Sequence, residues 1–255
     1  MKNPLPRARF NSSRLIRLLT ELADGDAAEP KQAKSSFAER LGQWLGFADA
    51  IALSAALNSP AAKTAGAGAA SSTEAADASI SAQFARVRGS LVAAIRGEGT
   101  GKARIRLPEA PADFSAAIAF APYRRYCLAH QRDMAAEIGQ LRIELRAALT
   151  RHSPALAQLA ALDAVFDRAL GERERELLAK VPALLETRFT QRQAAAASGR
   201  QATPASWLAA FCGDLQTVLL AELELRLQPV QGLLETLNEA QNKACREEAA
   251  AASIS

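Results

Sequence analysis

Cys127 and His130 stand one helical turn apart, a spacing that can place a thiol and an imidazole on one metal ion or form a nucleophile and its base. Tetrahedral zinc needs four ligands, whereas the only other histidine, His152, lies about six helical turns further along. No Gly-rich oxyanion loop accompanies the pair, and both residues fall on an apolar helical face. We therefore interpret them as a core thiol and a core histidine with satisfied hydrogen bonds, and we expect no metal and no cofactor.

The stretch GEGTGKA, residues 97–103, has the glycines and the lysine of a phosphate-binding loop. Its spacing is wrong, however, because Arg96 stands where the first glycine belongs and Ala103 replaces the hydroxyl residue that would hold magnesium. No β-strand is expected before it. We predict a flexible basic turn that binds no nucleotide.

Carboxylates and arginines alternate in the stretch between residues 163 and 176, and this alternation is typical of a solvated helix face with pairs at i and i+4. Such pairs contribute only a few tenths of a kcal/mol each, and they hold no acid and base apart in a cleft. The sequence therefore predicts a protein without enzymatic activity. The residues concerned are Asp163, Asp167, Glu172, Glu174 and Glu176 with Arg168, Arg173 and Arg175.

Basic and aromatic residues interleave at Tyr123, Arg124, Arg125 and Tyr126, and more arginines occur between residues 86 and 106. Residues 1–106 hold 15 Lys and Arg against 9 Asp and Glu, whereas residues 213–255 hold 3 against 7. A basic surface with tyrosines available for stacking would suit nucleic acid, which is the alternative function that we keep open. No known DNA-binding motif accompanies it, so we favour a solvated face or a surface for a protein partner.

The stretch FAERLGQWLGFADAIALSAALN, residues 37–58, carries Gly42 and Gly46 around Trp44. Its apolar residues recur at three- and four-residue steps, so it predicts a helix, and its charged residues exclude a membrane span. Glycine inside a helix costs about 0.5 to 1 kcal/mol relative to alanine, which suggests that a neighbouring helix approaches closely here. Together with Trp207, these three residues are our candidates for packing or interaction.

The composition favours an all-α fold. Of the 255 residues, 49% are hydrophobic and only 5% are aromatic, and Ala and Leu dominate over the β-branched residues that strands prefer. We expect an N-terminal helical segment at 1–58, a flexible Ala/Gly/Ser-rich linker at 59–78, and a bundle of long antiparallel helices at 79–255. The helices of the bundle should cover about 79–96, 113–122, 122–151, 153–170, 182–199, 203–229 and 230–248.

Proline and serine residues set most of these boundaries. Ser153 should cap a helix whose first residue is Pro154, and Pro182 allows a kink or a new start. We expect Pro229 to end one helix, because an interior proline removes a hydrogen bond and clashes with the preceding turn.

The three cysteines, Cys127, Cys212 and Cys245, are far apart in the chain and form no disulfide framework, which indicates a reducing compartment. The basic N-terminus lacks the uninterrupted apolar block of a signal peptide. We therefore expect a cytoplasmic protein without a transmembrane segment.

A family resemblance runs through five stretches, which cover nearly the whole chain outside the linker: FAERLGQWLGFADAIALSAAL, FAPYRRYCLAHQRDM, SPALAQLAALDAVFDRAL, VPALLETRF and WLAAFCGDLQTVLLAELELRLQPVQGLLETLN. Together they resemble an uncharacterised proteobacterial family, domain of unknown function 3348. The family has no assigned activity or catalytic residues, so it implies no role for any single residue. It does imply a cytoplasmic helical partner of an envelope assembly with OmpA-like and MotA- or TolQ-like proteins.

The leading functional hypothesis is a non-catalytic helical interaction or scaffold protein with protein partners, which forms a homo-oligomer. The long apolar faces are too extended to be buried on both sides within one small bundle, so part of them should pack against another molecule.

Overall fold

The fold is all-α, as predicted. The computed structural model describes residues 14–24, 46–58, 70–98, 106–108, 118–198 and 204–252, and these residues contain helices and no strand. The helices are α1 (Arg14–Asp24), α3 (Phe47–Asn58), α4 (Ala70–Arg96), α5 (Ala121–His152), α6 (Pro154–Leu178), α7 (Val181–Ala197) and α8 (Pro204–Ala252). None of these helices combines the length with the apolar character that crossing a bilayer requires.

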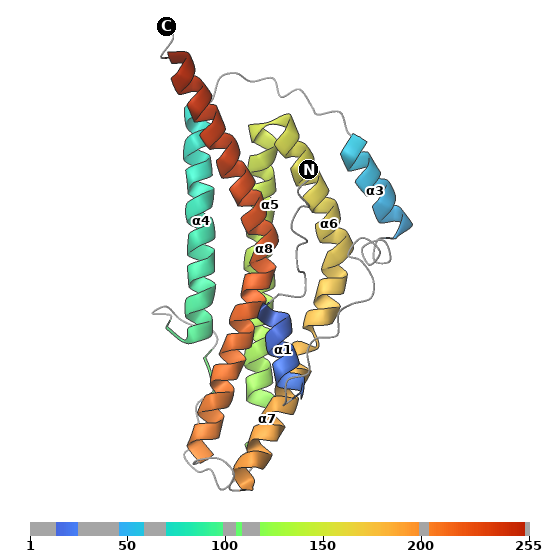
Figure 1. The fold of residues 1–255 in the computed structure, drawn as a ribbon, viewed down its shortest axis with the longest axis vertical. Coiled ribbons are helices and arrows are strands. Elements are labelled where there is room, and N and C mark those ends of the chain that lie inside the picture. The colour runs from blue at the N-terminus through green and yellow to red at the C-terminus, as the bar shows by residue number, and fades with distance from the viewer. Residues whose placement is uncertain are drawn as a thin grey trace, which may run out of the picture.

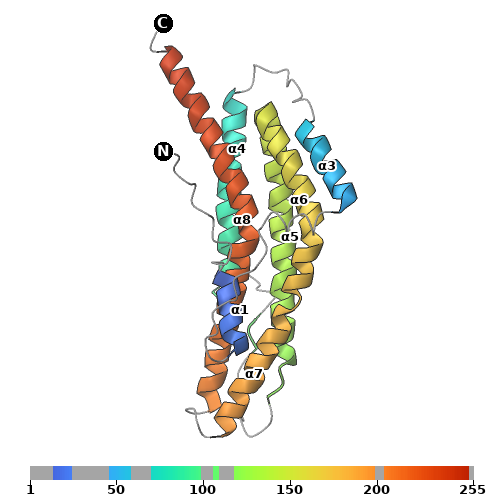
Figure 2. The same cartoon turned by 45° about the vertical axis from the view of Figure 1, so that its right-hand side comes forward.

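The long helices form an elongated antiparallel bundle (Figure 1). The chain descends along α4, rises along α5, descends again through α6 and α7, and returns over the whole length along α8. Helix α5 contacts α4, α6, α7 and α8, so it lies at the centre of the bundle. Helix α1 packs on α7 and α8, and α3 lies on the outer side of α6, as both views show (Figure 2).

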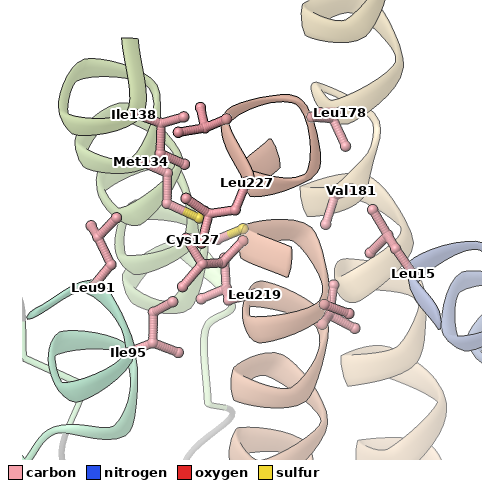
Figure 3. Close-up of a cluster of buried hydrophobic side chains, with 14 of the residues drawn as sticks. Leu15, Leu91, Ile95, Cys127, Met134, Ile138, Leu178, Val181, Leu219 and Leu227 are labelled. Atoms are coloured by element: carbon pink, nitrogen blue, oxygen red, sulfur yellow. The ribbon is translucent and has the colours of Figure 1, made fainter. Parts of the chain in front are cut away.

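Side chains from α1 and from α4 to α8 meet in one hydrophobic core. Figure 3 shows Leu91 and Ile95 of α4, Met134 of α5 and Leu219 of α8 in this core. Leu15 of α1 is only 2% exposed and belongs to the same core. The part of the predicted N-terminal segment that forms α1 therefore packs on the bundle instead of building a core of its own.

The turn between α5 and α6 has the predicted cap. Ser153 is extended, with φ −157° and ψ 157°, and its hydroxyl oxygen accepts a hydrogen bond from the backbone N–H of Leu156 at 3.3 Å. Pro154 follows as the first residue of α6, where its missing N–H leaves no bond unmade. This short turn makes α5 and α6 antiparallel neighbours. A second start, predicted as one option at Pro182, is also observed, because α7 begins at Val181.

Pro229 does not end a helix, and this prediction is wrong. Helix α8 runs without a break through Pro229. The residues around the proline explain why, since Leu227, Val230 and Leu237 are at most 3% exposed and lie in the core. Burying each of these side chains contributes about 1.5 to 3 kcal/mol, which outweighs the roughly 3 kcal/mol that an interior proline costs.

Two further boundaries differ from the prediction. Helix α4 begins at Ala70, so residues 70–78 of the predicted linker are helical, while 59–69 lie outside the described residues. Alanine is the best helix former, and it needs no buried partner to favour this conformation. Of the predicted helix at 113–122, residues 113–117 lie outside the described residues, Ile118 and Ala119 are not helical, and residues 121 and 122 already belong to α5. The carbonyl oxygen of Ile118 instead accepts a hydrogen bond from Nε2 of Gln193 in α7 at 3.2 Å.

Candidate functional sites

A groove with many arginine side chains lies between α5, α6 and α8. Its volume is about 500 Å³. In α6 it is lined by positions 164, 167, 168, 171, 174 and 175, which recur every three or four residues and form one helix face. We call it the arginine groove, because Arg142 and Arg146 of α5, Arg168 and Arg175 of α6 and Arg226 of α8 all line it.

Two of these arginines are held by two aspartates across the α5–α6 contact. Asp163 accepts hydrogen bonds from Nε and Nη2 of Arg142, at 2.9 and 2.5 Å, and from Nε of Arg146 at 2.6 Å. Asp167 accepts from Nη1 of Arg142 at 2.7 Å and from Nη2 of Arg146 at 2.6 Å. Burial lowers the pKa of Arg146, but the bonds and charges of Asp167 and Asp163 raise it above its ordinary value. Arg146 therefore stays charged near neutral pH.

This network corrects the interpretation of the acidic stretch as a solvated face at Asp163 and Asp167, whereas Arg168, Glu172, Arg173, Arg175 and Glu176 are exposed as predicted. Asp163 is only 10% exposed in its side chain, and its partners lie on the neighbouring helix instead of four residues away on its own. Arg173 and Glu176 do form a pair within α6, three residues apart instead of the expected four, at 2.9 Å and about half exposed. Arg142 and Arg146 were missed as network members, although they precede Ser153 by 11 and 7 residues and the aspartates follow it by 10 and 14. Because α5 and α6 are antiparallel about this turn, the nearly equal spacings could have predicted that the arginines and the aspartates face each other.

A fully buried carboxylate ties three helices together at the other end of the groove. Glu222 of α8 is 0% exposed and accepts hydrogen bonds from Nε and Nη2 of Arg226, at 3.0 and 2.8 Å. Nε2 of Gln131 in α5 donates to both of its oxygens and also to the carbonyl oxygen of Leu178 in α6. Arg226 in turn lies 3.5 Å from Glu174 of α6. The sequence carries no signal for this cluster, because its members lie far apart in the chain.

The remaining two arginines of the groove are open to solvent. Arg168 and Arg175 are exposed, and in the part of the chain that the structure describes neither forms an ion pair. Arg175 donates from Nε to the carbonyl oxygen of Gly171, 3.1 Å away. Gly139 and Gly171 also line the groove, and a Cβ atom added at either would meet no atom within 4 Å. Each glycine costs about 0.5 to 1 kcal/mol in its helix, without a close helix contact to require it.

Cys127 and His130 are buried in the core, as predicted. Cys127 is 0% exposed and lies near Met134 and Leu227 (Figure 3). Burial, and next the charge of Glu222, raise the pKa of its thiol to about 12. His130 is 1% exposed, and its ring packs edge-on against Tyr126 with the centroids 4.4 Å apart.

The imidazole of His130 nevertheless lacks one hydrogen bond, so the prediction that its hydrogen bonds are satisfied is wrong. Its Nε2 finds no hydrogen-bond partner among the described residues. Burial lowers the pKa of its imidazole, and the charge of Asp133 opposes this shift without cancelling it. No three His, Cys, Asp or Glu side chains in the described ranges gather closely enough to hold a metal ion.

The tyrosines of the basic stretch point inward, so they are not available for stacking on bases. Tyr123 and Tyr126 are 2% and 3% exposed, while Arg124 and Arg125 are exposed. The nucleic-acid alternative therefore loses the feature that distinguished it from a plain basic surface. Burial is the main cause that raises the pKa of Tyr126, to about 12.

Trp207 belongs to an aromatic cluster at the start of α8. Its ring lies 5.2 Å from that of Phe189, measured between centroids, and Phe189 lies 5.0 Å from Phe211. Tyr123 adds to the cluster, 5.5 Å from Phe211 in an edge-to-face arrangement. Trp207 is only 4% exposed, so it packs within this protein and offers little surface to a partner.

Gly42 and Trp44 lie outside the described residues, so the prediction of close packing around Trp44 can be compared with the structure only at Gly46. Gly46 precedes α3, and its N–H donates to a carboxylate oxygen of Asp49 at 3.1 Å. A Cβ atom there would meet only that same oxygen, at 3.5 Å, so no described helix approaches Gly46 closely. The glycine lies at the helix start, where capping geometry matters more than close packing.

Gly97 ends α4. Gly97 has φ 74°, a conformation that side chains other than glycine rarely adopt, and the N–H of Glu98 donates to the carbonyl oxygen of Ala93 at 2.9 Å. This is the usual glycine termination of a helix. Residues 99–105 of the predicted basic turn lie outside the described residues.

The outward side of α3 is apolar and exposed. Phe47 is 85% exposed, Ile51 is 55% exposed, and the two residues are one turn apart on the same face. Ala56 on the opposite side is buried, where α3 packs on α6. The carbonyl oxygen of Leu57 accepts a hydrogen bond from Nε2 of Gln158 in α6 at 2.7 Å. We call Phe47, Ile51 and the exposed alanines Ala48 and Ala55 the outer face of α3.

Comparison with known proteins supports the resemblance noted from the sequence. No curated protein and no solved structure matches the chain. The family described as "Protein of unknown function (DUF3348)" matches residues 1–239. Because this match covers most of the 255 residues, the protein belongs to the DUF3348 family.

Proposed function

We propose that this protein is a non-catalytic helical interaction protein that self-associates through the outer face of α3. The observation that carries the proposal is the exposure of Phe47 and Ile51, at 85% and 55%, on one face of a helix. Burying exposed apolar surface contributes about 25 cal/mol per Å², so such a face favours association.

A second copy of the same chain suits this face better than a charged partner. The only ionisable residue in α3 is Asp49, which is half-buried and accepts the N–H of Gly46. Two copies related by a two-fold axis would therefore bring apolar side chains together without placing like charges opposite each other.

The chemical state of the candidate nucleophile supports a role without catalysis. With a pKa of about 12, the Cys127 thiol stays protonated and unreactive at physiological pH. Asp163 and Asp167 are each engaged by two arginines, in ion pairs that join α5 to α6. Cys127 and Cys212 are free thiols, which suits a reducing cytoplasm.

Light scattering after size exclusion tests this function on the full chain. At tens of micromolar the wild-type protein should be a dimer or larger, and Phe47→Glu with Ile51→Glu should be a monomer. Ile143→Glu is the matched control, since Ile143 of α5 is also apolar and 58% exposed but lies outside α3. A monomeric wild type, or equal dissociation by the control, would overturn the proposal.

The envelope assembly implied by the family resemblance is an extension of this proposal. Its test is direct binding of the purified chain to a purified OmpA-like, MotA-like or TolQ-like protein. If the outer face of α3 forms this contact as well as the contact between two copies of the chain, Phe47→Glu should weaken both.

A further inference from the structure

We propose that the arginine groove binds a small soluble anion that carries at least one phosphate group. This site is separate from the outer face of α3 and does not depend on self-association. The proposal rests on the unequal charge of the lining, on the rigidity of its inner arginines, and on the open space kept by two glycines.

The lining of the arginine groove carries more positive than negative groups. Five arginines line the groove, but only two carboxylates do, Asp167 and Glu174. The buried partners Asp163 and Glu222 explain why Arg142, Arg146 and Arg226 are present as structural ion pairs. They do not explain Arg168 and Arg175, which have no ion-pair partner in the described ranges and face the same groove. These two guanidinium groups are free to bind an incoming anion.

The inner arginines of the groove are held in place before any ligand binds. The side chains of Arg142, Arg146 and Arg226 are only 14%, 17% and 11% exposed, and each is fixed by carboxylates. A ligand that contacts them therefore orders no long flexible side chain, which removes a common cost of binding. The guanidinium plane presents parallel N–H donors that match the oxygens of a phosphate group.

Two glycines leave open space in the groove. Gly139 of α5 and Gly171 of α6 border the groove, and a Cβ atom at either would meet nothing within 4 Å. No helix contact requires these glycines, whereas any larger side chain would occupy the groove. A volume of about 500 Å³ falls within the range of small-molecule sites.

A phosphate group suits the groove better than a monocarboxylate does. The ligand must compete with Asp167 and Glu174 for the same arginines, and a phosphate dianion carries more charge for that competition than a single carboxylate. Arg168 and Arg175 are two turns apart on α6, about 10 Å along its axis, so an extended phosphate ester can reach both. Buried Met134 and Ile138 give the ligand body an apolar floor.

Isothermal titration calorimetry with inorganic pyrophosphate on the full chain tests this inference, with sodium chloride used to match the ionic strength. The wild type should show saturable binding to one site, and Arg168→Gln with Arg175→Gln should weaken it at least tenfold. The matched control is Arg124→Gln with Arg125→Gln, which removes the same charge from exposed positions outside the groove. Equal weakening by both pairs would show a general charge effect and overturn the proposal.

A second variant tests the space without changing charge. Gly139→Leu should fill the groove and abolish binding while the protein melts at the same or a higher temperature, because the new Cβ meets no described atom and leucine favours the helix more than glycine. No heat of binding at millimolar pyrophosphate would overturn the proposal. So would binding to vesicles that contain phosphatidic acid, lost with Arg168 and Arg175, if soluble pyrophosphate does not bind, because the phosphate would then belong to a lipid.

Discussion

The hydroxyl group of Tyr126 in α5 donates a hydrogen bond of 2.8 Å to the carbonyl oxygen of Ile95, one residue before the end of α4. Nε2 of Gln216 in α8 donates to the same oxygen at 2.9 Å. Helix ends leave carbonyl groups without backbone partners, and here two side chains from different helices supply them. This single oxygen therefore joins α4, α5 and α8.

Tyr126→Phe should lower the free energy of unfolding by about 0.5 to 1.5 kcal/mol, because one hydrogen bond is lost and the other remains. Combining it with Gln216→Leu should cost more than the sum of the single changes, since Ile95 then keeps a carbonyl without either donor. Urea unfolding followed by circular dichroism measures both effects. Strict additivity would show that the two donors act independently.

Asp163→Ala should lower the free energy of unfolding by roughly 2 to 4 kcal/mol, because it leaves Arg142 and Arg146 partly unpaired at a site that is 10% to 17% exposed. Glu176→Ala is the comparison. Its pair with Arg173 is half exposed, so its loss should cost less than about 1 kcal/mol. Similar losses for both variants in urea unfolding would contradict the difference in burial.

His130 should make the protein less stable as the pH falls. Burial lowers the pKa of the native imidazole below its unfolded value of about 6.5. Above that value both states are neutral, and the histidine has no effect on the pH dependence. As the pH falls from about 6.5 towards the native pKa, the unfolded state binds a proton that the native state does not, so stability is lost.

His130→Phe keeps an aromatic ring beside Tyr126 and removes the titrating group. The unfolding free energy of the variant should therefore change less between pH 7 and pH 5 than that of the wild type. Urea titrations at several pH values measure the difference between the two proteins. Identical pH dependences would show that His130 does not titrate differently in the two states.

Cys127 should resist thiol reagents in the native protein. The pKa of its thiol is raised to about 12, and the side chain is 0% exposed, so both the thiolate and access to it are lacking. In the double variant Cys212→Ser with Cys245→Ser, a chromogenic disulfide reagent at pH 8 should react only after denaturant is added. Rapid reaction of the folded double variant would show that the core around Cys127 opens readily.

Several features could be predicted from the sequence because their causes are local. Alanine and leucine favour helix at each position separately, so the all-α class did not depend on knowing which helices touch. The start of α6 was readable for the same reason, since the Ser153 hydroxyl reaches a backbone N–H only three residues away.

Only the tertiary structure decided which side chains face each other across helices. Arg142 and Asp163 are 21 residues apart and meet because of the register between α5 and α6, and Glu222 meets Gln131 across 91 residues. The same holds for Tyr123 and Tyr126, whose inward orientation follows from packing, and for Pro229, whose local cost is overcome by the buried residues around it. Helix propensity acts within one turn of the chain, whereas the arginine groove exists only where three helices come together.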